Sequence, residues 1–167
     1  YDRTFVIRVI FDYDRCNGVG NSRKEDKTFS CEPTVQVCID QFGPVRFETM
    51  RDQAIANGVS EVHPNTAMMP ESKYLGVDLS EAPAELLKAS YPGTYASEAM
   101  APMLVQHGTG DHLVPWAQSE EFVKDLQTRG FGHKVVYVPL EGADHEDKRF
   151  TAPENTEVVF AFIEKHM

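Results

Sequence analysis

Two polar residues in the last third of the chain have the types and the spacing of a catalytic acid and its histidine. Asp111 follows an apolar segment at 103–107, and His145 follows another apolar segment at 134–140. One strand–helix–strand excursion separates the two residues, so both are expected at the carboxyl edge of a parallel sheet. A carboxylate placed there can orient an imidazole and stabilise it when it takes a proton. The pair therefore indicates acid–base or nucleophilic catalysis.

Each member of the pair also has an interpretation without chemistry. Asp111 could end a strand and cap the helix that follows, and His145 could be a surface histidine within the acidic run 144–147. The acidic run 144–147 together with His145 could also suggest a metal site. However, adjacent residues of one loop seldom bind the same metal ion, and the chain has no paired His or Cys motif that would support such a site. His107 and His112 flank the acid and could be ligands, although packing is the simpler role. We expect no metal and no cofactor.

The elements that would hold the pair are predicted from apolar periodicity. Strands are predicted at 34–40, 103–107 and 134–140, and a helix from Pro115 to about Arg129 has Trp116, Phe122, Val123 and Leu126 on its inner face. A last helix follows Pro153, with a capping box formed by Thr151 and Glu154. Its buried residues are expected to be Val158, Val159, Phe162 and Ile163. The alternation of strand and helix predicts an α/β fold, a parallel sheet with flanking helices.

The first two thirds of the chain give weaker patterns. Residues 1–13 alternate as a strand that is apolar on both faces, as in a parallel sheet, and 17–33 is polar and predicted to be a loop. Between 45 and 101 one helix is expected, with Ser80 as its N-cap and its end at Ser90. The loop 142–149 near the histidine has no evident anchor, so we expect it to be mobile.

Length and charge limit the classes of function. The chain has 167 residues, which predicts one domain over 1–167, and a net charge of −10 disfavours binding to nucleic acid or to anionic lipid. No apolar run reaches the roughly 20 residues that span a bilayer, so no membrane span is expected. No signal peptide pattern is visible, and the compartment is left open. Cys16 and Cys31 could form a disulfide or stay reduced, and Cys38 is expected to be inert inside its strand.

Several segments, taken in order, are similar to a known family. The segment 106–115 (QHGTGDHLVP) resembles the acid segment H-G-x-x-D-x-x-V-P of α/β-hydrolases, and 142–145 (GADH) resembles their histidine segment. Residues 35–44 (VQVCIDQFGP) look like a strand of esterase and lipase proteins similar to acetyl-xylan and feruloyl esterases. Three shorter stretches fit the same group: 74–76 (YLG), 89–92 (ASYP) and 149–154 (RFTAPE). The resemblance covers about 33–167 and implies the C-terminal part of an α/β-hydrolase fold, with 1–32 as an atypical strand and loop.

The family's nucleophile is the feature that this chain lacks. Such esterases attack with a serine in a G-x-S-x-G elbow, and no such motif occurs here. The nearest approach is Ser22 in 20–24 (GNSRK), which lacks the second glycine. The oxyanion-hole motif H-G-G-x is absent as well.

The resemblance implies a carboxylic-ester hydrolase acting on small esters with short acyl or carbohydrate-linked groups. In it His145 would carry the proton, Asp111 would orient His145, and the serine would lie outside what the sequence makes evident, with Ser22 a weak candidate. The alternatives are a non-catalytic remnant that serves as a binding or assembly module, and a different chemistry in which the pair activates water. A partial sheet leaves an open edge, so we expect a homodimer or a complementing segment to cover it.

Overall fold

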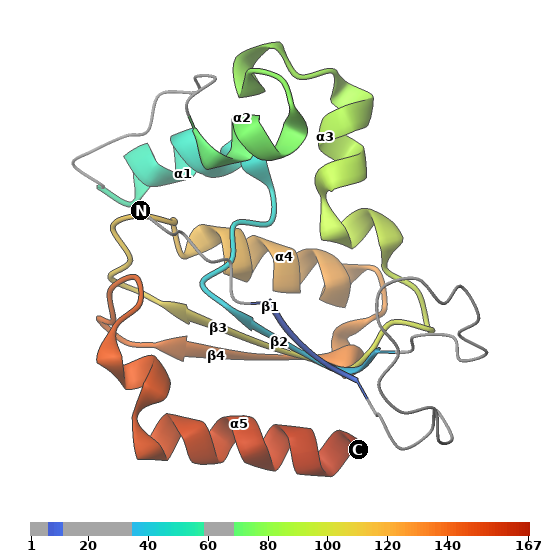
Figure 1. The fold of residues 1–167 in the computed structure, drawn as a ribbon, viewed down its shortest axis with the longest axis vertical. Helices are drawn as coiled ribbons and strands as arrows, with labels where there is room; N and C mark the ends of the chain where they lie inside the picture. The colour runs from blue at the N-terminus through green and yellow to red at the C-terminus, as the bar shows by residue number, and fades with distance from the viewer. Residues whose placement is uncertain (1–6, 12–34, 59–68) are drawn as a thin grey trace, which may run out of the picture.

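In the part of the chain that the structure describes, the sheet has three parallel strands and one antiparallel edge strand. The computed structural model describes the backbone of residues 7–11 and all atoms of residues 35–58 and 69–167. Within these residues the strand order is β1 (Ile7–Phe11), β2 (Val35–Gln41), β3 (Met103–Gly108) and β4 (Val135–Leu140) (Figure 1). Strands β2, β3 and β4 are parallel neighbours. The expected α/β class and the three C-terminal strands are confirmed.

The direction of β1 differs from the expectation. It pairs with β2 in the antiparallel sense, with Ile7 opposite Asp40 and Ile10 opposite Val37. The alternation of apolar residues tells which faces of a strand are covered, but it carries no information on strand direction. An antiparallel edge strand on an otherwise parallel sheet is a common arrangement.

The helices cover both faces of the sheet. Helix α4 (Ala117–Thr128) lies on one face and α5 (Pro153–His166) on the other (Figure 1). Helices α1 (Met50–Ala56), α2 (Pro70–Leu75) and α3 (Ala84–Ser90) lie beyond α4. Among the described residues, five short 3-10 helices join these elements: η1 (Phe47–Thr49), η2 (Leu79–Glu81), η3 (Pro92–Tyr95), η4 (Gly132–Lys134) and η5 (Lys148–Thr151).

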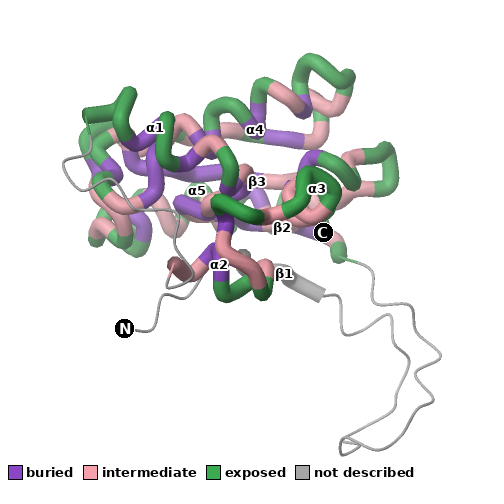
Figure 2. The backbone as a smooth tube through the Cα atoms, turned by 90° about the horizontal axis from the view of Figure 1, so that it is seen from above, coloured by how far each residue is buried: buried purple, intermediate pink, exposed green. Residues whose placement is uncertain are grey.

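Strand β3 is the centre of the core, because successive side chains on a strand point to opposite faces. Val105 packs with Phe122, Val123 and Leu126 of α4, whereas Leu104 packs with Phe162 of α5. Figure 2 shows the buried residues gathered along β3 and along α4. The predicted inner residues of α4 are confirmed, with Trp116 only half-buried at its N-cap. Because β3 is packed on both faces, its end is held in place, and the loop that carries Asp111 begins there.

Two helix starts differ from the sequence-based expectation. The side chain of Asp78 accepts from the Ser80 amide, so it caps the short helix η2, and α3 begins only at Ala84 after Pro83. At α5 the N-cap is Ala152 without a side-chain cap, because the Thr151 hydroxyl donates to the Lys148 carbonyl instead. A serine or threonine near a helix start has several local backbone partners, and the sequence does not say which one it takes.

The buried side of α5 is narrower than expected. Phe162 is buried and Val159 and Ile163 pack against the same cluster, but Val158 is 42% exposed. A single helix lying on a sheet presents only one stripe to it, so the residue next to that stripe faces solvent.

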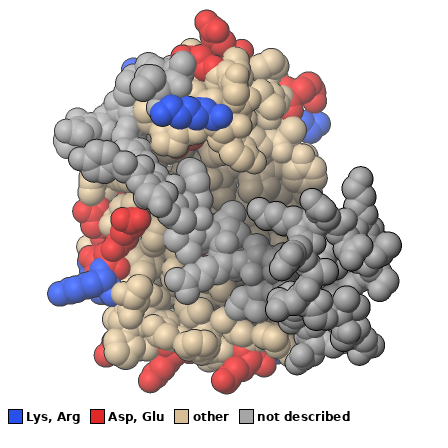
Figure 3. All heavy atoms as spheres, viewed as in Figure 1, with Lys and Arg blue, Asp and Glu red and all other residues tan. Residues whose placement is uncertain are grey.

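The charged surface and the helices bear on two further expectations. On the face in Figure 3, the described acidic side chains lie around the rim and the basic ones are separated from one another. That the chain binds no nucleic acid remains a prediction. Among the helices that the structure describes, none combines the length and the apolar character needed to cross a bilayer.

Candidate active site

Asp111 and His145 lie side by side at the carboxyl edge of the sheet. Asp111 is in the loop after β3, His145 is in the loop after β4, and the His145 Nδ1 atom is 2.8 Å from the Asp111 Oδ2 atom. The Asp111 side chain is fully buried and the His145 side chain is 17% exposed. The expectation that both residues lie at the carboxyl edge of the parallel sheet is confirmed. Their catalytic roles remain a prediction.

Backbone contacts between the two loops produce this meeting. The Thr109 amide donates to the Leu140 carbonyl and the Gly110 amide donates to the Ala143 carbonyl, each at 3.0 Å. The His145 loop packs closely against Gly108 at the end of β3, where a Cβ atom would lie 2.2 Å from the Ala143 carbonyl oxygen. Only glycine permits this approach, since a side chain there would occupy the space of the other loop.

Asp111 is ionised at neutral pH because its hydrogen bonds outweigh its burial. Burial would raise the pKa of this carboxyl, but hydrogen bonds from His107, His145 and the Val114 amide hold the pKa well below its usual range. The Asp111 Oδ1 atom accepts from the amides of Leu113 and Val114, both at 2.8 Å. The carboxylate is therefore fixed in place by its own loop, with Oδ2 turned toward the histidines.

The ring of His145 is held in one orientation. Its Nδ1 faces a carboxylate oxygen, which can only accept, so Nδ1 carries a proton and Nε2 is left for other partners. No hydrogen bond to Nε2 occurs within the described part of the chain. Phe42 packs edge-on against the imidazole, with ring centroids 4.7 Å apart. Phe42 itself has a φ of 50°, a strained conformation for a bulky residue, in the turn that ends β2.

The loop that carries His145 is anchored, so the expectation that it lacks an anchor was wrong. The Arg149 guanidinium donates to the carbonyls of Glu141 and Gly142, both at 2.7 Å, and pairs with Asp147 at 2.7 Å. Asp144 accepts from the His145 amide at 2.7 Å and from the His112 amide and ring. The sequence placed these charges in one polar segment, but the bonds depend on how the loop folds back on itself.

The neighbouring histidines have structural partners, and burial keeps the Cys38 thiol protonated. His107 is fully buried and lies 2.7 Å from the Ser119 hydroxyl, and the exposed His112 pairs with Asp144. The residues that the structure describes contain no cluster of His, Cys, Asp and Glu suited to a metal ion. Burial raises the pKa of the Cys38 thiol to about 11, which keeps it protonated, as expected for an inert cysteine. Ser22, Cys16 and Cys31 lie outside the described residues.

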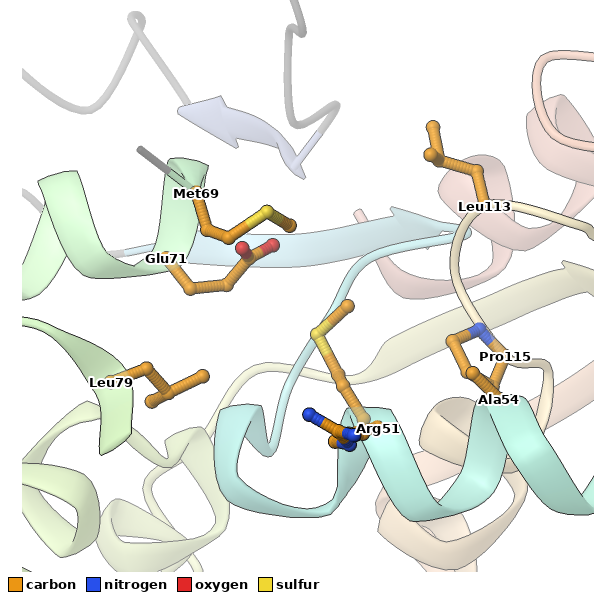
Figure 4. A pocket seen from close by; sticks show the side chains of 8 residues that line it. Arg51, Ala54, Met69, Glu71, Leu79, Leu113 and Pro115 are labelled. Atoms are coloured by element: carbon orange, nitrogen blue, oxygen red, sulfur yellow. The ribbon is translucent and has the colours of Figure 1, made fainter. Parts of the chain in front are cut away.

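A mainly apolar pocket lies beside the acid loop. Leu113 and Pro115, which follow Asp111, form one side of it, and residues of α1, α2 and η2 form the rest (Figure 4). The pocket lining consists of Met50, Arg51, Ala54, Met69, Glu71, Leu79, Leu113 and Pro115. The weak sequence patterns between 45 and 101 thus include the wall of a pocket next to the candidate acid.

A protein-family model matches most of the chain. The BD-FAE family model matches residues 16–126. The chain belongs to the BD-FAE family. This is an α/β-hydrolase family, so the resemblance stated from the sequence motifs is confirmed. The BD-FAE match includes Asp111, begins earlier than the resemblance at 33–167, and ends before His145.

The solved structures similar to this BD-FAE chain include esterases. A truncated carbohydrate esterase from gut microbiota is 23% identical with a TM-score of 0.62 and is matched over 83% of this chain and 45% of its own. A bifunctional GH43-CE protein of Bacteroides eggerthii is 22% identical with a TM-score of 0.60, and the match covers 80% of this chain and 16% of that protein. A thermophilic esterase of Thermogutta terrifontis is 20% identical with a TM-score of 0.52, and the match covers 87% of this chain and 46% of that esterase. No curated protein sequence matches the chain.

These likenesses establish the fold and the extent of the match. The BD-FAE chain spans less than half the length of the solved structures it matches. A partial α/β-hydrolase fold is therefore confirmed.

Three residues shape this site through contacts that sequence reasoning did not predict. They are His107, which lies against Asp111; Phe42, which packs on His145; and Gly108, where the loops touch. His107 and Gly108 were visible as the H-G pair of the acid segment, but their partners lie in other elements. Phe42 gave no local signal, because its contact with His145 joins the ends of strands β2 and β4.

Proposed function

We propose that this chain supplies the acid and the histidine of a serine carboxylic-ester hydrolase. The observation that carries the proposal is the 2.8 Å hydrogen bond between His145 Nδ1 and the buried carboxylate of Asp111. The membership in an esterase-type α/β-hydrolase family supports it. A non-catalytic binding or assembly module is the alternative, and it would leave the hydrogen bond from His145 to the buried Asp111 carboxylate without a task.

In the proposed reaction His145 moves one proton at a time. Its Nε2 takes the proton of a serine hydroxyl as the serine oxygen attacks the ester carbonyl, and it gives that proton to the departing alcohol. Water then attacks the acyl-serine, and Nε2 takes a proton from the water and returns it to the serine oxygen. Asp111 stays ionised throughout and stabilises the imidazolium. The products are one alcohol and one carboxylic acid.

The proposed substrates are small esters with short acyl groups or carbohydrate alcohols. The names of two solved relatives, a carbohydrate esterase and a GH43-CE protein, support this class. The apolar pocket beside Leu113 and Pro115 is of a kind that suits a short acyl or alkyl group.

The nucleophile of the proposed hydrolase is not evident in this chain, and this gives a direct expectation. Because no serine here stands in an elbow motif, we expect no labelling by a fluorophosphonate probe and negligible turnover of p-nitrophenyl acetate by the chain alone. Mass spectrometry of the probe-treated chain would detect the label. Stoichiometric labelling of Ser22 would contradict the expectation and assign that residue as the nucleophile.

The competence of the pair can be measured without a nucleophile. Diethyl pyrocarbonate acylates the unprotonated nitrogen of an imidazole, so the rate at His145 reports the free lone pair of Nε2. In Asp111→Asn the amide can donate to Nδ1, which moves the ring proton to Nε2. We expect acylation of His145 to slow by about tenfold or more.

Two controls accompany this measurement. His133, whose side chain is 57% exposed, is the internal reference for reagent and pH. Asp144→Asn removes the neighbouring carboxylate and should leave the rate at His145 nearly unchanged. Equal acylation of His145 in the chain and in Asp111→Asn would contradict the proposed function and favour the non-catalytic module.

The open edge of the partial sheet belongs to the same proposal. In the strand order, β1 and β4 are the outer strands of the described sheet. A second copy of the chain, or a complementing segment that brings the serine, remains our prediction for what covers an edge.

A further inference from the structure

The acid of the candidate pair is contacted by a second histidine. Asp111 Oδ2, the atom that accepts from His145 Nδ1, also lies 3.3 Å from His107 Nε2. Both side chains of this second contact are fully buried. The other oxygen, Oδ1, is already used by two backbone amides. His107 therefore touches the one carboxylate atom that faces His145.

The surroundings of His107 determine which of its nitrogens carries a proton. Its Nε2 faces the Val114 carbonyl oxygen at 3.0 Å and the Asp111 carboxylate oxygen at 3.3 Å. Neither oxygen can donate, so Nε2 must be the donor. If the proton were on Nδ1 alone, the unprotonated Nε2, the Val114 carbonyl oxygen and the Asp111 carboxylate oxygen would face one another with no donor between them. Leaving buried acceptors without a donor is unfavourable, because each has lost its hydrogen bonds to water.

Ser119 completes this arrangement from the first turn of α4. It is fully buried, and its hydroxyl lies 2.7 Å from His107 Nδ1. A hydroxyl can donate to Nδ1 of a neutral ring or accept from Nδ1 of a cationic ring. In either state it leaves the proton on Nε2 and fixes the plane of the imidazole.

We propose that His107 and Ser119 are positioning residues for the acid of the site. Ser119 fixes the His107 ring, and the Nε2–H of His107 holds Asp111 Oδ2 in line with His145. This inference rests on the proposed function, because it gives the acid a task that needs a fixed orientation. It adds a second imidazole at the same carboxylate oxygen that accepts from His145.

The test uses nuclear magnetic resonance on the whole chain. Long-range proton–nitrogen spectra should show a proton on His107 Nε2, and the proton between His145 Nδ1 and Asp111 Oδ2 should exchange slowly with water. In Ser119→Ala that exchange is expected to quicken by about tenfold, the change that corresponds to losing one ordinary hydrogen bond. His107→Leu should quicken it further, and His107→Gln, which keeps a side-chain N–H of similar reach, should restore most of the protection.

A matched control separates positioning from loss of a buried hydroxyl. Ser72 is also buried, but its hydroxyl accepts from the Leu79 amide and not from His107 or Asp111, so Ser72→Ala should leave the His145 proton unchanged. Equal exchange in Ser119→Ala and Ser72→Ala, or a wild-type His107 protonated only on Nδ1, would overturn the proposal. If His107→Leu does not fold, Ser119→Ala and His107→Gln still decide. The readout needs neither ester nor serine, so a failure of ester hydrolysis would not be mistaken for a failure of this inference.

Discussion

Replacing Gly108 with alanine is expected to destabilise the fold by about 3 kcal/mol, the upper part of the range for overpacking a tight contact. The new Cβ atom would lie 2.2 Å from the Ala143 carbonyl oxygen and 2.7 Å from its carbon. Both atoms belong to backbone, so no side-chain rotation relieves the clash and the two loops must move apart. For a chain of this size the melting temperature should fall on the order of 10 °C.

The same substitution should disrupt the candidate pair. Moving the loops apart weakens the bond from the Gly110 amide to the Ala143 carbonyl, which holds the His145 loop against the Asp111 loop. We therefore expect the slowly exchanging proton between His145 Nδ1 and Asp111 Oδ2 to disappear from the spectrum. Calorimetry measures the stability and proton spectra measure the pair.

Gly132 provides a matched control for this change. A Cβ atom there would meet only Gln127, with its flexible Cγ at 3.2 Å, so Gly132→Ala should change stability by less than about 1 kcal/mol. A Gly108→Ala variant as stable as Gly132→Ala, with the His145 proton retained, would show that the loops can separate without loss of the site.

Replacing Asp40 with asparagine is expected to stabilise the chain at pH 8. Asp40 lies near the end of β2, it is buried, and its Oδ1 atom has no hydrogen-bond partner among the described residues. Burial raises the pKa of this carboxyl from 3.8 to about 6, although the His107 ring and the Gly43 amide offset part of the effect. Above pH 6 the folded chain thus holds a buried charge that has too few donors.

The direction of the pH dependence follows from this raised pKa. Between about pH 4 and pH 6 the folded chain binds the proton of Asp40 more tightly than the unfolded chain does, so stability falls as the pH rises through that window. The full cost above the window corresponds to about 3 kcal/mol. Asparagine removes the charge but leaves an amide to be satisfied, so we expect a gain of about 1–3 kcal/mol at pH 8 that vanishes near pH 4.

Chemical denaturation at pH 4 and pH 8 measures this difference. Asp52→Asn, which removes an exposed carboxylate from α1, corrects for the general effect of lowering a net charge of −10. At pH 8 we expect Asp40→Asn to raise the free energy of unfolding more than Asp52→Asn does. At pH 4 we expect no such difference between the two variants. A loss of stability at both pH values would mean that the Asp40 carboxylate is better satisfied than its contacts indicate.

The sheet shows most clearly which parts of the fold can be predicted from the sequence. Strands β2, β3 and β4 were predictable because each is a short apolar run between polar breaks, and α4 because its apolar residues recur with the period of a helix. The direction of β1 was not predictable, since the side-chain alternation of a strand is the same in both directions. The starts of α3 and α5 depended on which local backbone group each polar side chain chose.

The candidate site divides in the same way. The identities of Asp111 and His145 and the edge they share came from the amino-acid sequence, because motif spacing and the handedness of crossovers place both residues at strand ends. The contacts that hold them came only from the tertiary structure. Phe42 on His145, Ser119 on His107 and Ala143 against Gly108 each join residues from different elements. Such contacts depend on atomic distances between loops and helices, and these distances are fixed only when the elements pack together.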